Sequence, residues 1–149
     1  MKIVVQRVSA ASVQIQNKEI AKIGSGLMLL IGIDKLDSRK EADWAADKCV
    51  NLRIFNDADG KMNRSLLETG GSVLAVSQFT LLGNTKKGRR PSFIDAAQPE
   101  KGKELYDYFV EKLKSFNVTV ECGVFGAMMQ VELINEGPVT LIIETTNSP

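Results

Sequence analysis

The chain has 149 residues, 44% of them hydrophobic and 25% charged, as is typical of a soluble globular domain. Its 19 Lys and Arg residues against 18 Asp and Glu residues exclude a protein coated in basic charge but allow a local basic patch. Two cysteines without any histidine cannot form the usual Cys/His ligand sets for zinc, so we expect neither a metal nor another cofactor.

The first third of the sequence is predicted to form β-strands. Apolar and β-branched residues dominate residues 3–8, 12–15, 20–23 and 26–33. Arg7 is the lone charge inside the first strand, where it either points to solvent at a sheet edge or holds a carbonyl or carboxylate in place. The beginning of the chain does not resemble a signal peptide, and no apolar run reaches the roughly 18 residues that cross a bilayer. We therefore expect a cytoplasmic protein.

A change of hydrophobic period predicts a helix over residues 39–51. Ser38 and Glu41 have the spacing of a capping box, and apolar residues follow at helical spacing: Ala42, Ala45, Ala46, Cys49 and Val50. We expect a short strand over residues 52–55. Residues 57–60 (DADG) predict a turn, because the rest of a calcium-loop ligand pattern is missing.

Residues 72–82 are predicted to be a buried strand, because both alternating sets of side chains are mostly apolar. Alternation places Ser77 and Phe79 on one face of this strand and Gln78 and Thr80 on the other. These side chains can therefore share a site only if the strand bends, or if main-chain N–H groups, which can stabilise an oxyanion, do part of the work. The alternative is that they are hydrogen-bonded core residues.

A basic segment follows within the loop predicted for residues 83–91: Lys86, Lys87, Arg89 and Arg90. Four cations so close together suit phosphate oxygens, and such binding depends on salt. The alternative is a solvated loop with no ligand. The segment does not itself distinguish an RNA backbone from another phosphate.

The last third is predicted to contain a helix beginning near Pro99 and three strands, over residues 118–121, 127–134 and 139–145. Residues 135–138 (NEGP) are expected to be a short turn, and the sequence does not decide whether the Gly-Pro bond in it is cis or trans. Many strands, two helices and no βαβ alternation predict one α/β domain of the α+β type over residues 1–149. Its mainly antiparallel sheet should curl like a barrel, with both helices packed on it.

Five segments together resemble the D-aminoacyl-tRNA deacylase family, formerly called D-tyrosyl-tRNA deacylases. They are residues 1–8 (MKIVVQRV), 51–55 (NLRIF), 77–81 (SQFTL), 88–93 (GRRPSF) and 135–140 (NEGPVT). The resemblance implies a homodimer that proofreads translation. Its reaction would be hydrolysis of the ester between a D-amino acid, or glycine on the wrong tRNA, and the 3′ end of tRNA.

The resemblance also implies roles for individual residues. Gly137 and Pro138, joined by a cis bond, would enter the partner subunit's site and exclude the side chain of an L-amino acid, and Arg7 would hold them. The pocket around the ester would be lined by Ser77, Gln78, Phe79 and Thr80. The positions near the terminal adenosine would be Phe125, Gly126 and Met129.

The absence of histidine bears on the mechanism, because no Ser-His-Asp or Cys-His arrangement can form. We expect main-chain donors near Phe79 and Thr80 to stabilise the oxyanion, and water to attack with help from the 2′-hydroxyl of the tRNA. Thr80 as nucleophile is the alternative. Two other functions stay open: an editing domain, which would need a fused synthetase, and a non-catalytic RNA-binding domain, which would need only the basic segment.

Overall fold

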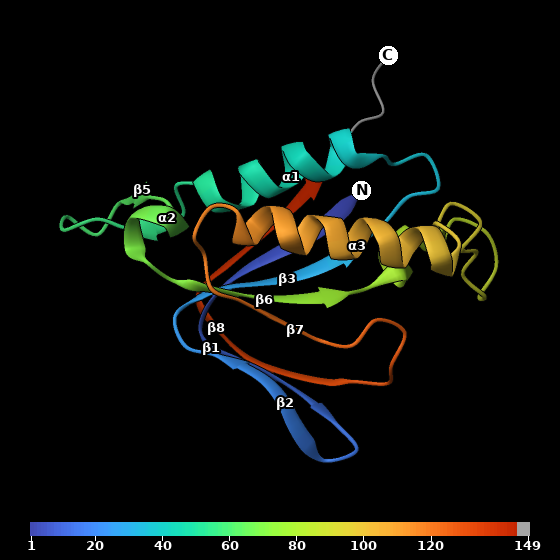
Figure 1. Cartoon of the computed structure of the whole chain (residues 1–149), viewed down its shortest axis with the longest axis horizontal. Coiled ribbons are helices and arrows are strands. Elements are labelled where there is room, and N and C mark those ends of the chain that lie inside the picture. Colours follow the sequence, from blue (N-terminus) through green and yellow to red (C-terminus); the bar gives the residue numbers. More distant parts are fainter. Residues whose placement is uncertain (146–149) are drawn as a thin grey trace.

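The structure is a computed structural model that describes residues 1–145. A mixed sheet lies beneath two long helices and curls away from them (Figure 1). The sheet contains β1 (Lys2–Ile15), β2 (Lys18–Ile23), β3 (Gly26–Gly32), β6 (Ser72–Ser77), β7 (Val120–Cys122) and β8 (Gln130–Glu144). The remaining elements are α1 (Arg39–Asn51), the hairpin of β4 (Phe55–Asn56) and β5 (Met62–Arg64), α2 (Leu66–Thr69), the 3₁₀-helix η1 (Phe79–Leu82) and α3 (Pro99–Lys114).

The strand order is β2-β1-β3-β6-β7, and β8 pairs with β1. Strand β1 is antiparallel to β2, β3 and β8, whereas β3, β6 and β7 run parallel. Strand β2 comes close to β6 and β7, so the sheet is nearly closed. The predicted α/β fold, a curled mixed sheet with two packed helices, is confirmed; the short helices α2 and η1 were not predicted.

Both faces of the sheet are covered. On one face, α1 and α3 pack against β1, β3 and β6, and the core there includes Ile3, Leu29 and Phe109. On the other face, the curl of the sheet buries a second cluster that includes Val8, Met28 and Leu74. Because side chains of a strand alternate between faces, burial on both sides explains the nearly continuous apolar sequence of β3 and β6.

Helix α1 begins where the sequence predicts. The Ser38 hydroxyl accepts a hydrogen bond from the Lys40 N–H group, and the Glu41 carboxylate accepts one from the Ser38 N–H group. The buried face of the helix consists of the residues expected: Ala42, Ala45, Ala46, Cys49 and Val50. The turn at residues 57–60 and the start of α3 at Pro99 are also confirmed.

Other boundaries were predicted wrongly. Residues 3–8 and 12–15 belong to one strand, β1, and of residues 52–55 only Phe55 is in a strand. The strand predicted over residues 72–82 ends at Ser77, because its last paired residue lies opposite Ile31, one residue before β3 itself ends. The chain then folds into η1, which packs so closely over Gly32 that an added Cβ there would lie 2.5 Å from Leu82.

Residues 135–138 do not connect two separate strands. They lie within β8, whose two halves both pair with β1. Only Arg7 lies between Gln6 and Val8 on β1, but residues 136–139 lie between the corresponding β8 partners, Thr140 and Asn135. Residues 136–139 therefore bulge out of β8 opposite Arg7, and we call them the β8 bulge.

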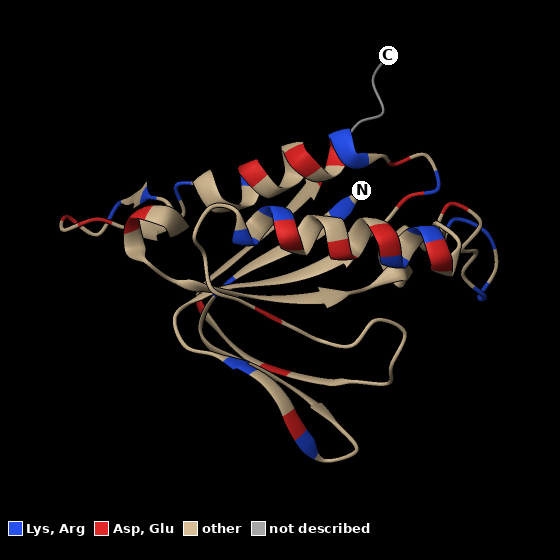
Figure 2. Cartoon of the chain, viewed as in Figure 1, with Lys and Arg blue, Asp and Glu red and all other residues tan. Residues whose placement is uncertain are grey.

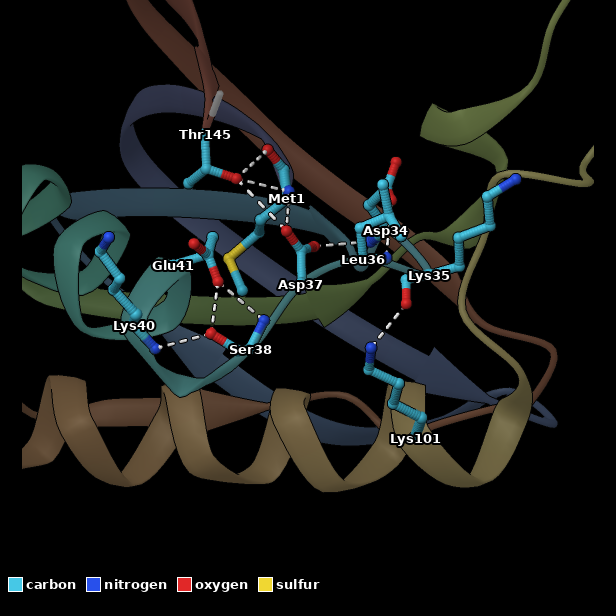
Figure 3. Close-up of polar contacts among 10 residues, drawn as sticks. All are labelled: Met1, Asp34, Lys35, Leu36, Asp37, Ser38, Lys40, Glu41, Lys101 and Thr145. Atoms are coloured by element: carbon cyan, nitrogen blue, oxygen red, sulfur yellow. Dashed lines mark hydrogen bonds and ion pairs between the residues drawn. The ribbon is translucent and has the colours of Figure 1, made fainter. Parts of the chain in front are cut away.

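A buried ion pair joins the beginning of β1 to the loop before α1 (Figure 3). The amino group of Met1 lies 2.5 Å from the Asp37 carboxylate, and both side chains are fully buried. The same amino group donates to the Thr145 hydroxyl, and the other Asp37 oxygen accepts from the Asp34 N–H group. The sequence did not predict this role for Asp37.

Among the helices of the described residues, none is long and apolar enough to cross a membrane.

Candidate active site

A cavity of about 340 Å³ opens where β6 ends and η1 begins. One wall comes from this junction and the other from the segment between β7 and β8. The cavity brings together six predicted site residues: Ser77, Gln78, Phe79, Phe125, Gly126 and Met129. Sequence reasoning missed most of the apolar lining, including Ile31, Gly102 and Met128.

The bend after Ser77 is what allows consecutive side chains to share one cavity. A regular strand would send Gln78 to the opposite face from Ser77 and Phe79, but the strand ends at Ser77 and η1 begins at Phe79. Thr80 is exposed and lies outside the cavity lining. Its hydroxyl accepts a hydrogen bond from the side-chain amide of Gln78, which connects it to the cavity wall.

Three consecutive main-chain N–H groups lie at this junction, and two of them are free. The N–H group of Gln78 is occupied, since it donates to the Ile31 carbonyl at 2.7 Å. The N–H groups of Phe79 and Thr80 come before the first hydrogen-bonded turn of η1, and within residues 1–145 neither donates to a protein acceptor. Both are therefore free to bind an oxygen of a ligand.

None of the described residues that line the cavity has a titratable side chain. Cys49 lies in the core, where burial raises the pKa of its thiol to about 12. Burial also raises the pKa of Cys122, so neither thiol is an activated nucleophile. The Tyr106 hydroxyl donates to the Ala75 carbonyl, and burial raises its pKa as well. The described residues contain no cluster of three side chains suited to a metal ion.

Gly102 of α3 forms part of the cavity wall. A Cβ atom at this position would lie 3.3 Å from the ring of Phe125, so glycine lets that ring lie close to the helix. The ring also packs against Tyr106, with centroids 5.9 Å apart. The position of Phe125 in the wall is therefore set by α3, far along the chain from the β6 junction.

Gly137 and Pro138 do not line the cavity of their own chain. They are exposed within the β8 bulge, and the peptide bond between them is cis. Arg7 is only 8% exposed, and its Nε donates to the Glu136 carbonyl at 3.1 Å. Of the two interpretations of Arg7, the structure therefore supports the one in which it holds a carbonyl group.

The basic segment lies at one end of the molecule, beyond the first turn of α3 (Figure 2). Its four cations are all exposed, and within the described part of the chain none forms an ion pair: Lys86, Lys87, Arg89 and Arg90. The loop that carries these cations ends beside the cavity, because Phe93 packs edge-on against Phe79 with ring centroids 5.3 Å apart.

A second, more open hollow of about 430 Å³ lies on the other side of η1. Its lining includes Asp34, Asp95, Glu144 and Lys86, but none of the residues predicted around the ester. Asp95 and Glu144 are paired with lysines. The apolar cavity at the β6 junction is thus the one that combines the predicted side chains with free main-chain donors.

Comparison with known proteins shows the family to which the chain belongs. The family model described as D-Tyr-tRNA(Tyr) deacylase matches residues 4–144. The D-aminoacyl-tRNA deacylase of Geotalea uraniireducens is 55% identical over 145 residues, covering 97% of this chain and 94% of that protein. The D-aminoacyl-tRNA deacylase of Bacillus velezensis is 54% identical over 145 residues, covering 97% of this chain and 99% of that protein.

Solved structures show the same fold. The c-Myc DNA unwinding element binding protein superposes with a TM-score of 0.92 and 39% identity, covering 98% of this chain and 99% of that one. A probable eukaryotic D-amino acid tRNA deacylase superposes with a TM-score of 0.80, covering 95% of this chain and 97% of that one; at 20% identity it supports the fold alone. The chain therefore belongs to the D-Tyr-tRNA(Tyr) deacylase family, whose named activity is hydrolysis of an aminoacyl-tRNA ester.

Proposed function

We propose that this chain hydrolyses the ester between a D-amino acid and the 3′ end of tRNA, releasing free tRNA and the D-amino acid. The observation that carries the proposal is the family match across residues 4–144. The cavity supports it, because it has an apolar wall for a nucleoside, and the free N–H groups of Phe79 and Thr80 lie at the junction where it opens. Glycine attached to the wrong tRNA is a further substrate under this proposal.

The chemistry proposed needs no side-chain base. A water oxygen attacks the ester carbonyl, and the N–H groups of Phe79 and Thr80 stabilise the oxyanion that forms. The bond to the ribose 3′ oxygen then breaks, and a proton from the attacking water passes to that oxygen. The neighbouring 2′-hydroxyl of the tRNA assists this transfer, since the cavity lining contains no titratable side chain.

Selection between enantiomers is assigned to the β8 bulge of a partner subunit. Backbone carbonyls of Gly137 and Pro138 would clash with the side chain of an L-amino acid, whereas a D-amino acid or glycine fits. A rigid group that clashes with the L-amino acid can give specificity even if it makes no contact with the D-amino acid. Backbone carbonyls also distinguish poorly between the side chains of different D-amino acids, so many D-amino acids should be substrates.

The proposal includes a homodimer, and the places of these parts support it. The cavity and the β8 bulge are separate within one chain, so a second copy is needed to bring them together. Strand β8 pairs along one edge only within residues 1–145. Large apolar side chains are exposed on strand β8 and at the rim of the cavity, namely Phe79, Met128, Ile134 and Ile142. An unpaired edge with exposed apolar groups is a surface that a second copy would cover.

We assign the basic segment to tRNA phosphates. It has four exposed cations without ion pairs in the described residues, and Phe93 fixes the end of its loop beside the cavity rim. A 3′ end that enters the cavity would carry the adjoining phosphates past this loop. Binding should then weaken as salt increases.

The test is ester loss from matched D-Tyr-tRNA and L-Tyr-tRNA. We expect the D ester to be hydrolysed and the L ester to persist at its rate in buffer alone. Hydrolysis of both esters at one rate would contradict the proposal. Tight tRNA binding without hydrolysis of either ester would instead support the non-catalytic RNA-binding domain.

A further inference from the structure

The β8 bulge is held by hydrogen bonds from both of its ends. Asn135 precedes it, and its side-chain oxygen accepts from the Val139 N–H group at 3.1 Å. The Nδ2 group of Asn135 donates to the Thr140 hydroxyl at 2.8 Å, and the Gln6 side chain donates to the same hydroxyl at 3.3 Å. One amide side chain thus spans the bulge and fixes the residue on its far side.

Arg7 holds the bulge from the β1 side. Besides the bond from its Nε to the Glu136 carbonyl, its guanidinium lies against Gly137, where an added Cβ would be 3.0 Å from Nη2. Gly137 has φ +129°, a conformation that L side chains rarely adopt. The guanidinium therefore contacts the bulge at two successive residues, Glu136 and Gly137.

The position of Arg7 depends in turn on the β4–β5 hairpin. Its Nη1 donates to the Ile54 carbonyl at 2.8 Å and to the Asn56 side-chain oxygen at 3.3 Å. Among the described residues no carboxylate pairs with Arg7, so neutral oxygens hold this buried cation. Asn56 supplies the only side-chain acceptor that Arg7 has in this part of the chain.

The hairpin itself is fixed by a local network. The Asp57 carboxylate accepts from the N–H groups of Asp59 and Lys61 and from the Asn63 side chain. Arg53 donates to the backbone carbonyl of Asn63 at 2.8 Å and to its side-chain oxygen at 3.0 Å. Because these bonds connect both strands of the hairpin, Asn56 is held in one position. A residue that orients another residue must itself be fixed in this way.

We infer that Asn56 and Asn135 are positioning residues for chiral discrimination. Asn135 acts on the bulge directly, and Asn56 acts through Arg7. This inference rests on the proposed function, because it assumes that the bulge of one chain limits access to the cavity of another. It adds a hairpin far from the cavity to the parts that determine which enantiomer is hydrolysed.

The test is the ratio of kcat/KM for D-Tyr-tRNA to that for L-Tyr-tRNA in Asn56→Ala and Asn135→Ala. We expect each substitution to lower the ratio about tenfold, the effect of one lost hydrogen bond of ordinary strength. A mere loss of folded protein lowers both rates equally and leaves the ratio unchanged. Asn56→Asp, which keeps an acceptor oxygen for Arg7, should retain the wild-type ratio.

Asn51→Ala is the matched control, because Asn51 is an exposed asparagine whose side chain, among the described residues, bonds only to Asp47 of its own helix. Its ratio should equal that of the wild type. Unchanged ratios in both Asn56→Ala and Asn135→Ala, with a discriminating wild-type enzyme, would overturn this inference and leave the proposed function intact. A wild-type enzyme that does not discriminate would overturn the proposed function as well.

Hydrogen exchange tests the contact between Asn135 and the bulge without an activity assay. Asn135→Ala removes the acceptor of the Val139 N–H group, so hydrogen exchange at Val139 should become faster, while exchange in α1 should not change. Protection of Val139 equal to that in the wild type would contradict the role of Asn135.

Discussion

The Thr80 hydroxyl is a poor candidate for the nucleophile because, among the described residues, its side-chain partner is the Gln78 amide, which cannot take its proton. It accepts a hydrogen bond from Gln78, and the neighbouring cavity has no titratable lining residue. A hydroxyl attacks well only when a base activates it. Water assisted by the substrate's own 2′-hydroxyl needs no such base, so Thr80 is assigned to the positioning of Gln78.

Thr80→Val keeps the shape of the side chain and removes the hydroxyl. We predict that kcat/KM for D-Tyr-tRNA falls by less than about tenfold, since one hydrogen bond to Gln78 is lost. Loss of a true nucleophile costs about 10⁴-fold or more. Steady-state kinetics distinguishes these outcomes, and a tRNA ending in 2′-deoxyadenosine is the companion substrate. Normal hydrolysis of that substrate, with Thr80→Val inactive, would reverse the assignment.

Single residues were predictable where their position in the sequence carried the signal. Polar residues at the end of an apolar strand pointed to Ser77 and Gln78, and an isolated charge in a strand pointed to Arg7. Asn56 and Asp37 gave no such signal. Their partners, Arg7 and the Met1 amino group, lie far away along the chain and meet them only in the folded molecule.

At the scale of elements, hydrophobic period predicted α1 and α3 well and the ends of strands poorly. A capping box and a helical period are local, so they fix a helix in the sequence itself. The end of β6 is set by β3, its partner, and by the close packing of η1 on Gly32. The β8 bulge was mistaken for a turn, because Gly-Pro between apolar runs is typical of both.

The connection between β3 and α1 depends on the buried pair of Asp37 with the Met1 amino group. Asp37→Asn leaves a buried positive charge without its counter-ion, which typically costs about 3–5 kcal/mol. We predict a fall of about 3 kcal/mol in the free energy of unfolding, measured by urea denaturation. The exposed turn residue Asp59 is the control, and Asp59→Asn should change stability by less than about 0.5 kcal/mol. A loss below about 1 kcal/mol for Asp37→Asn would contradict the importance of the pair.

At the scale of the whole molecule, the curled sheet places the cavity and the β8 bulge apart. The curl was predictable from the order of strands and helices, but the separation of the two parts was not, since it depends on which segments of β8 pair with β1. We therefore propose that a D-selective site combines the cavity of one chain with the bulge of its partner, so that neither part would discriminate alone.

A mixed dimer tests this claim most directly. One chain carries Ala127→Trp, which fills its cavity, and the other carries Gly137→Ala, whose Cβ would lie 3.0 Å from Arg7 Nη2 and displace the bulge. We expect the Ala127→Trp homodimer to be inactive and the Gly137→Ala homodimer to lose selectivity. In the mixed dimer the one open cavity faces an intact bulge, so hydrolysis of D-Tyr-tRNA should be selective again. If the mixed dimer hydrolyses L-Tyr-tRNA as readily as the Gly137→Ala homodimer does, the bulge does not act across the interface.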